Sequence, residues 1–136
     1  MAHRIVTAPG LAPPTGYAHA VVAEGVTVSL GGQTALDPSG RIVGDTLPEQ
    51  FDRAAANVMV ALRAAGGEAP DLVSVQIFVT DVADYRAHLH ELGVIWQRHF
   101  GRHYPASGLF GVTRLFDEAA LVELMAVAVL PGGAGA

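Results

Sequence analysis

Glu123 is the only charged residue in the apolar run 121–130, so its carboxylate is a first candidate for chemistry. In an extended strand Met125 points to the same face, about 6–7 Å further along. A carboxylate in such surroundings must meet water, pair with a donor or hold a proton. Either Glu123 lies at a polar subunit seam or sheet edge, or it acts as an acid or base in a cleft.

Histidine is the other side chain here that could move protons near neutral pH. His19 follows Tyr17 by two residues, so both side chains face the same way if this segment is a strand. His19 is then either a general acid or base or an ordinary polar strand residue.

Two pairs of histidines have spacings that invite a metal interpretation. His99 and His103 are four residues apart, but a glycine and a Tyr-Pro pair interrupt a helix there, whereas His88 and His90 point away from each other on a helix. No carboxylate completes a known ligand spacing around either pair. We therefore expect no metal site and no cofactor.

Several kinds of chemistry are excluded by residue type. All eight basic residues are arginine, so no lysine can form a Schiff base, and the absence of cysteine excludes thiolate nucleophiles and disulfides. Ser107 lacks the setting of a nucleophile elbow, and the Gly31-Gly32 pair lacks a dinucleotide-binding context. The formal net charge of −5 argues against a nucleic-acid partner.

Hydrophobic periodicity and turn residues predict the elements that position these groups. The order ββ-α-β-α-ββ favours an α+β fold, a sheet with two helices packed on one face. The expected elements are strands at 18–23 and 26–33 joined as a hairpin, a helix starting at 45–49 and ending at 66–67, a strand at 72–80, a helix capped by Asp81 and broken at 104–105, and strands at 108–114 and 121–130.

The 136 residues suit a single domain, 1–136, with terminal segments 1–9 and 132–136, of which the second should be mobile. Apolar residues make up 51% and charged residues only 15%, which suggests surface hidden in an oligomer. The start does not resemble a signal peptide, and the last uncharged run is too short and broken to span a membrane. We expect a cytoplasmic protein with no membrane partner.

Seven short segments share their order and spacing with a known family. The first is PTGYAHA at 14–20, and the others are LGGQ at 30–33 before a turn, residues 50–57, FVTD at 78–81, WQRHF at 96–100, YPA at 104–106, and residues 123–128. Together they resemble the RidA/YjgF family of reactive-intermediate deaminases, over roughly residues 10 to 131. The resemblance implies a chorismate-mutase-like fold, a homotrimer with ligand clefts between subunits, and hydrolysis of 2-imino or enamino acids to 2-keto acids and ammonia.

The resemblance also assigns site positions, three of which depart from the deaminase pattern. Ser107 stands where the deaminases carry an arginine that pairs with the substrate carboxylate, Met125 where they carry a glutamate, and Gly93 where they carry an asparagine. A serine hydroxyl cannot supply the charge of a guanidinium. Arg114 lies at an odd offset from Ser107, on the other face of a regular strand, so it does not replace the missing arginine.

Tyr17, Gly31 and Gly32 fall on family positions that line the cleft, and the residues argued above, with Leu109 beside Ser107, complete the predicted site. The candidate catalytic residues are Tyr17, Ser107 and Glu123, and the candidate ligand-binding residues are His19, Gly31, Gly32, Gln33, Leu109 and Met125.

Three functions stay open from the sequence. The first is a RidA-like enzyme acting on a small imine, enamine or related intermediate, with an altered site that does not deaminate standard 2-imino acids. The second is a non-catalytic small-molecule-binding or accessory protein of the same family. The weakest is an endoribonuclease, which some relatives are named for, since the chain is acidic and lacks lysine.

Overall fold

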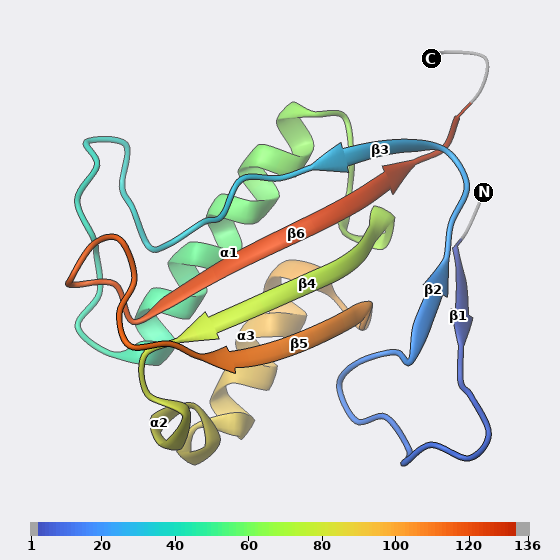
Figure 1. Ribbon diagram of the computed structural model, residues 1–136. Coiled ribbons are helices and arrows are strands. Elements are labelled where there is room, and N and C mark those ends of the chain that lie inside the picture. Colours follow the sequence, from blue (N-terminus) through green and yellow to red (C-terminus); the bar gives the residue numbers. More distant parts are fainter. Residues whose placement is uncertain (1–2, 133–136) are drawn as a thin grey trace.

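A four-stranded sheet forms the centre of the computed structural model, which describes residues 3–132 (Figure 1). The strand order is β3-β6-β4-β5. Strands β3 (Val26–Ser29), β6 (Val122–Leu130) and β4 (Leu72–Val79) pair antiparallel, whereas β5 (Ala106–Gly111) runs parallel to β4. A parallel pair needs a long crossover, and the helices that follow β4 provide it.

Helices cover one face of this sheet (Figure 1). They are α1 (Leu47–Ala64), α2 (Val82–Ala87) and α3 (Leu89–Phe100), with a 3-10 turn, η1, at Ala69–Asp71. The predicted α+β class and the one-sided packing are therefore confirmed. None of the helices in the described part of the chain is long and apolar enough to cross a membrane.

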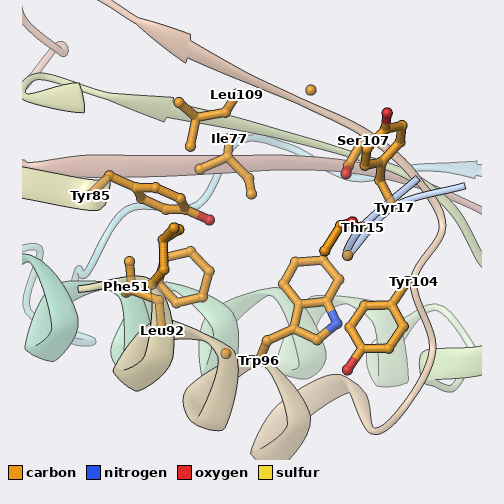
Figure 2. Close-up of a pocket in the computed structure, with 14 residues that line it drawn as sticks. Thr15, Tyr17, Phe51, Ile77, Tyr85, Leu92, Trp96, Tyr104, Ser107 and Leu109 are labelled. Carbon is orange, nitrogen blue, oxygen red and sulfur yellow. The ribbon is translucent and has the colours of Figure 1, made fainter. Parts of the chain in front are cut away.

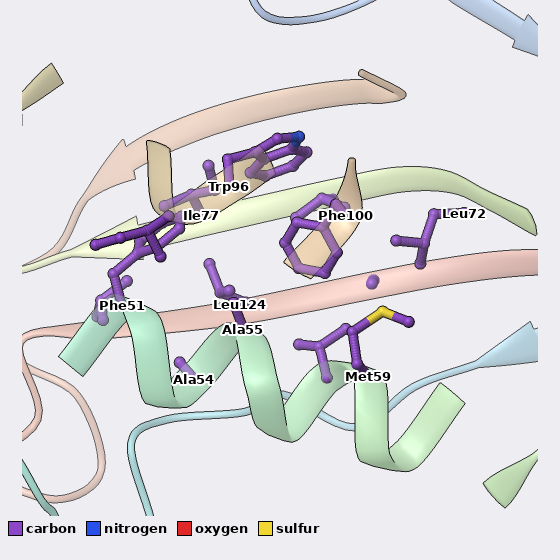
Figure 3. Close-up of a cluster of buried hydrophobic side chains, with 14 of the residues drawn as sticks. Phe51, Ala54, Ala55, Met59, Leu72, Ile77, Trp96, Phe100 and Leu124 are labelled. Carbon is purple, nitrogen blue, oxygen red and sulfur yellow. The ribbon is translucent and has the colours of Figure 1, made fainter. Parts of the chain in front are cut away.

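The core lies between the sheet and the helices (Figure 3). Alternate residues of β4 and β6, such as Val75 and Leu124, are fully buried, as are Phe51 and Leu62 of α1. This alternation follows from the two-residue period of a strand, and the spacing along α1 follows from the helical period. Both patterns were visible in the sequence.

The start and end of α1 agree with the predicted signals. The Thr46 side chain accepts a hydrogen bond from the Glu49 amide at 3.3 Å, and Pro48 occupies the first turn. Gly66 then takes a left-handed conformation with φ 92°, which a glycine adopts without steric cost.

The segment predicted as the second helix forms two helices, α2 and α3, because the chain bends at His88. The imidazole Nδ1 bonds to the Asp84 carbonyl at 2.9 Å, and the His88 amide donates instead to the Tyr85 carbonyl. The side chain thus competes for an acceptor that a continuous helix would use.

The predicted hairpin of residues 18–23 and 26–33 is wrong. Strand β2 (Ala20–Val22) pairs with β1 (Arg4–Val6), which falls in the expected terminal segment, and β3 pairs with β6. At Gly25, with φ 148°, the chain passes so close to the Leu130 carbonyl that a side chain would collide with it. Tertiary contact with β6 therefore decides the partners of this segment.

The boundaries of β5 also differ from the prediction of 108–114. The strand begins at Ala106, since its register with β4 starts there, and ends at Gly111. The predicted mobile tail falls mostly on residues 133–136, which lie outside the described range.

The sheet face opposite the helices is uncovered in one chain. Phe110 and Met125 are nearly half exposed there, and the Phe110 ring stacks on Phe78 with centroids 5.4 Å apart. An apolar surface of this kind is typical of a contact face between chains.

Candidate functional site

A cavity of about 760 Å³ opens between the edge of the sheet and helix α3 (Figure 2). Its volume lies within the range typical of pockets for drug-sized ligands. Residues from five separate parts of the chain line it, from Thr15 near the N-terminus to Leu109 in β5. The cavity is therefore a product of the tertiary fold.

The sheet side of the cavity is formed by β4 and β5. The parallel register aligns Ile77 with Leu109 and Val75 with Ser107. Because Val75 is fully buried on the helix-covered side, its neighbour Ser107 faces the same way. Ser107 and Leu109 therefore both line the cavity.

The helix side is mostly aromatic. Phe51 of α1, Tyr85 of α2 and Trp96 of α3 contribute rings, and Gly93 leaves an opening because no atom lies within 4 Å of where its side chain would begin. Tyr104, which follows α3, stacks on Trp96 with centroids 6.3 Å apart.

Tyr17 lies at the end of the cavity next to Ser107 (Figure 2). The Ala18 amide donates to the Pro105 carbonyl at 3.2 Å, and Ala18 forms a parallel bridge with Ala106. This pairing extends the sheet by one short segment. The fold thus brings together Tyr17 and Ser107, two of the three predicted catalytic residues.

His19 is engaged by the backbone of the N-terminal segment. The Ala8 amide donates to Nδ1 at 2.9 Å, so Nε2 carries the proton that it donates to the Ala12 carbonyl at 2.8 Å. Both ring nitrogens are therefore occupied. The imidazole lines a shallower hollow of about 390 Å³ on the other side of Tyr17, where it holds the loop before β2.

No ionised side chain lines the larger cavity among the described residues. Its polar side-chain groups are hydroxyls and the Trp96 indole N–H, which donates to the His103 carbonyl at 3.0 Å. The hydroxyls of Thr15, Tyr17, Tyr85 and Ser107 form no hydrogen bond within residues 3–132. The Tyr104 hydroxyl accepts from Gln97 at 2.9 Å. Burial raises the pKa of Tyr85, so its phenol stays protonated at neutral pH.

The other predicted site residues form a second group, around β3 and β6. Leu30 and Gln33 both pair with β6, and the two glycines between them stand opposite the single residue Met125, which makes a β-bulge. The Gly31 and Gly32 amides make no hydrogen bond within the described residues.

Glu123 belongs to this second group and packs against Gly32. A side chain at Gly32 would begin 2.9 Å from Cδ of Glu123, so the carboxylate would have to move aside to admit it. Glu123 pairs with Phe78 across β6 and β4, on the uncovered face of the sheet. One chain therefore does not bring Glu123 or Met125 to the cavity that contains Ser107.

Two further sequence interpretations concern residues outside the cavity. Arg114 bonds to the Phe116 carbonyl and to Glu118, both at 3.0 Å, and does not line the cavity. His99 bonds to Asp52 at 2.6 Å, and His103 bonds to the Leu72 carbonyl at 2.7 Å. In the described range no three histidine or acidic side chains come together in a way that could hold a metal ion.

Sequence reasoning missed the aromatic half of the cavity. Tyr85 and Trp96 have the helical spacing of core residues within the segment predicted as the second helix. Each is indeed packed with the core but also lines the cavity. No local signal separates the two roles, because the cavity depends on how far β5 stands from α3.

A family model described as Endoribonuclease L-PSP matches residues 7–130. A RutC family protein of Pyrococcus abyssi is 29% identical over 94% of this chain and 98% of its own length. A human protein named 2-iminobutanoate/2-iminopropanoate deaminase is 28% identical over 90% of this chain and 84% of its own.

Solved structures agree with these sequence matches. A protein of the conserved Rid family from Yersinia pestis has a TM-score of 0.85 and 30% identity, and the match covers 96% of this chain and all of that one. The E. coli protein TdcF, solved with bound serine, has a TM-score of 0.68 and 29% identity over 93% of this chain and 97% of its own.

Proposed function

The chain belongs to the endoribonuclease L-PSP, or RidA/YjgF, family, and from this premise we propose that it acts on a small, neutral, partly apolar metabolite of the imine or enamine type. Standard 2-imino acids, which carry a carboxylate, are poor substrates under this proposal. Tyr17 and Ser107 contact the ligand in the cavity beside β5.

The observation that carries the proposal is the absence of charge among the described residues of the cavity wall. An anionic ligand would lose its hydration there without gaining a cationic partner, which costs free energy. A neutral ligand meets hydroxyl groups that can donate or accept hydrogen bonds. The family resemblance places Ser107 where the deaminases carry arginine, which agrees with this preference.

The second group of site residues joins the cavity through assembly. We propose a homotrimer in which the uncovered sheet face of one subunit packs against the β5 edge of its neighbour, where the cavity opens, so that Gly31, Gly32, Glu123 and Met125 approach that cavity. The half-exposed apolar side chains on that face support this arrangement. Leu109 and Gln33 complete the two sides of such a cleft.

Hydrolysis in this cleft requires a water molecule to add to the C=N carbon. The C–N bond then breaks, the water oxygen becomes the carbonyl oxygen, and both water protons end on the nitrogen, which leaves as ammonia. Glu123 is the only carboxylate among the candidate residues, so it is the proposed group to orient or deprotonate the water. Tyr17 and Ser107 hold the substrate.

The test compares wild-type protein with the human relative named 2-iminobutanoate/2-iminopropanoate deaminase. An amino-acid oxidase generates 2-imino acids, and release of the keto acid is followed over time. Loss of a bidentate arginine–carboxylate contact predicts a catalytic efficiency lower by about 30- to 1,000-fold. Equal turnover by the two proteins would contradict the proposal.

A non-catalytic binding role is the second candidate, favoured by the absence of an acid or base among the described residues of the cavity wall. It predicts ligand binding without turnover of any imine in the panel, including neutral ones. Ribonuclease activity remains the weakest candidate, since the chain has a net charge of −5 and no lysine.

A further inference from the structure

The cavity has hydrogen-bonding groups at both ends and an apolar middle. Figure 2 shows Tyr85 at one end, with its hydroxyl directed across the cavity, and Ser107 with Tyr17 at the other. Ile77, Leu92 and Trp96 lie between them. A ligand that fills this space must carry polar groups at opposite ends of an apolar body.

The cavity in one chain is larger than a three- or four-carbon acid needs. Its volume of about 760 Å³ is far larger than such a molecule, which would leave most of the aromatic wall facing empty space or water. The rings of the wall that are partly exposed are those of Tyr17, Tyr85 and Tyr104, and they favour a flat partner, because offset and edge-to-face contacts between rings are favourable.

Tyr85 is placed to recognise one end of such a ligand. Its ring packs against Phe51, with centroids 6.4 Å apart, and its hydroxyl has no partner within residues 3–132. The raised pKa keeps this phenol a hydrogen-bond donor at neutral pH. The Tyr104 hydroxyl, by contrast, accepts a hydrogen bond from the Gln97 side chain.

We infer that the ligand is a neutral, ring-containing compound with a carbonyl-type acceptor at one end, and that Tyr85 selects it by donating a hydrogen bond to that acceptor. This inference rests on the proposed function and narrows its ligand class. It assigns specificity to a residue of α2, outside the positions that the family resemblance identified.

The experiment uses three probes and the full-length protein. 4-Hydroxyacetophenone has a carbonyl and a hydroxyl at opposite ends of a ring, 4-ethylphenol lacks the carbonyl, and pyruvate is a small anion. Trp96 is the only tryptophan of the chain and lines the cavity, so its fluorescence reports occupancy. Wild-type protein should bind the ketone about tenfold more tightly than 4-ethylphenol.

Tyr85→Phe should weaken binding of the ketone by about five- to tenfold and leave 4-ethylphenol unchanged. Thr113→Val, which removes an exposed hydroxyl outside the cavity wall, is the control and should change neither, and thermal unfolding checks that both variants are folded. An equal effect of Tyr85→Phe on both ring compounds, no effect on either, or no binding of any ring compound would overturn the inference. Tighter binding of pyruvate than of the ring compounds would instead overturn the proposed function itself.

Discussion

Ser107 and Glu123 lie on opposite faces of one sheet. Ser107 is in register with the buried Val75, whereas Glu123 is in register with Phe78, three residues further along β4. An odd offset along a strand reverses the direction of the side chain. A ligand in contact with both residues therefore requires two chains, each of which contributes one face.

The first prediction is that the protein forms the proposed trimer in solution. Light scattering at micromolar concentration should give about three times the 14.1 kDa mass of one chain. Phe110→Asp should lower that mass, because it buries a charge in the contact face. Val60→Asp, at an exposed position of α1, is the control and should leave the trimer intact. A wild-type mass near 14 kDa would rule the assembly out.

Ser107→Arg should change the ligand preference of the cavity. The guanidinium can pair with a carboxylate, so binding of pyruvate should improve by about tenfold or more, and binding of 4-hydroxyacetophenone should weaken. Trp96 fluorescence measures both. Val60→Arg adds the same charge far from the cavity and should have no effect. Unchanged affinities in the Ser107 variant would count against the proposed ligand class.

Gly32→Ala should be destabilising because the added methyl group meets the Glu123 side chain. We expect a loss of about 1 kcal/mol, at the low end for overpacking, since the carboxylate can move aside. Gly31→Ala is the matched control, with no atom within 4 Å of its added carbon, and should be neutral.

The double variant Gly32→Ala with Glu123→Ala tests the contact directly. If the methyl group acts through Glu123, its cost should disappear once the Glu123 side chain has been truncated, which gives a coupling energy of about 1 kcal/mol. Urea unfolding at one fixed protein concentration provides the free energies, because assembly makes them concentration-dependent. Additive effects would show that Gly32 is needed for another reason.

Gly93→Ala should stabilise the protein. Gly93 lies inside α3, and its added carbon would meet no atom within 4 Å. Alanine in a helix interior is more stable than glycine by about 1 kcal/mol, which corresponds to an increase of a few degrees in Tm. Calorimetry provides the measurement. A lower Tm would indicate that a neighbouring subunit packs against this position.

The hydrogen bonds and ion pairs of Asp52 lead us to expect that the folded protein loses a little stability in acid. Its partial burial raises the pKa of the carboxyl, but the hydrogen bond from His99 and the charges of His99 and Arg98 outweigh this, so the net pKa is lowered. A lowered pKa stabilises the fold above about pH 4 and loses that contribution as the pH falls through the folded-state value.

Asp52→Asn should accordingly reduce the free energy of unfolding at about pH 6 by less than about 1 kcal/mol, as for an exposed ion pair, and by less still at about pH 3. Glu24→Gln, a carboxylate with no ion pair within the described residues, is the control. A constant difference between the two pH values would contradict the assignment.

The sequence alone was sufficient for the parts that depend on local interactions. The Thr46 cap, the apolar spacing after Phe51 and Gly66 defined α1, because capping and helical period act over a few residues. Runs of β-branched and apolar residues between turn signals located β4 and β6. Residue types alone excluded lysine and cysteine chemistry.

Only the tertiary structure decided which strands are partners and where the site residues meet. The segment after Gly25 pairs with β6, about a hundred residues away, because burial against the core outweighs a local hairpin. Likewise, Tyr85 lines the cavity because α2 packs beside α1 and the sheet, and strand register puts Ser107 and Glu123 on opposite faces. Such contacts depend on the closure of long loops and on packing of distant surfaces, which a local pattern does not encode.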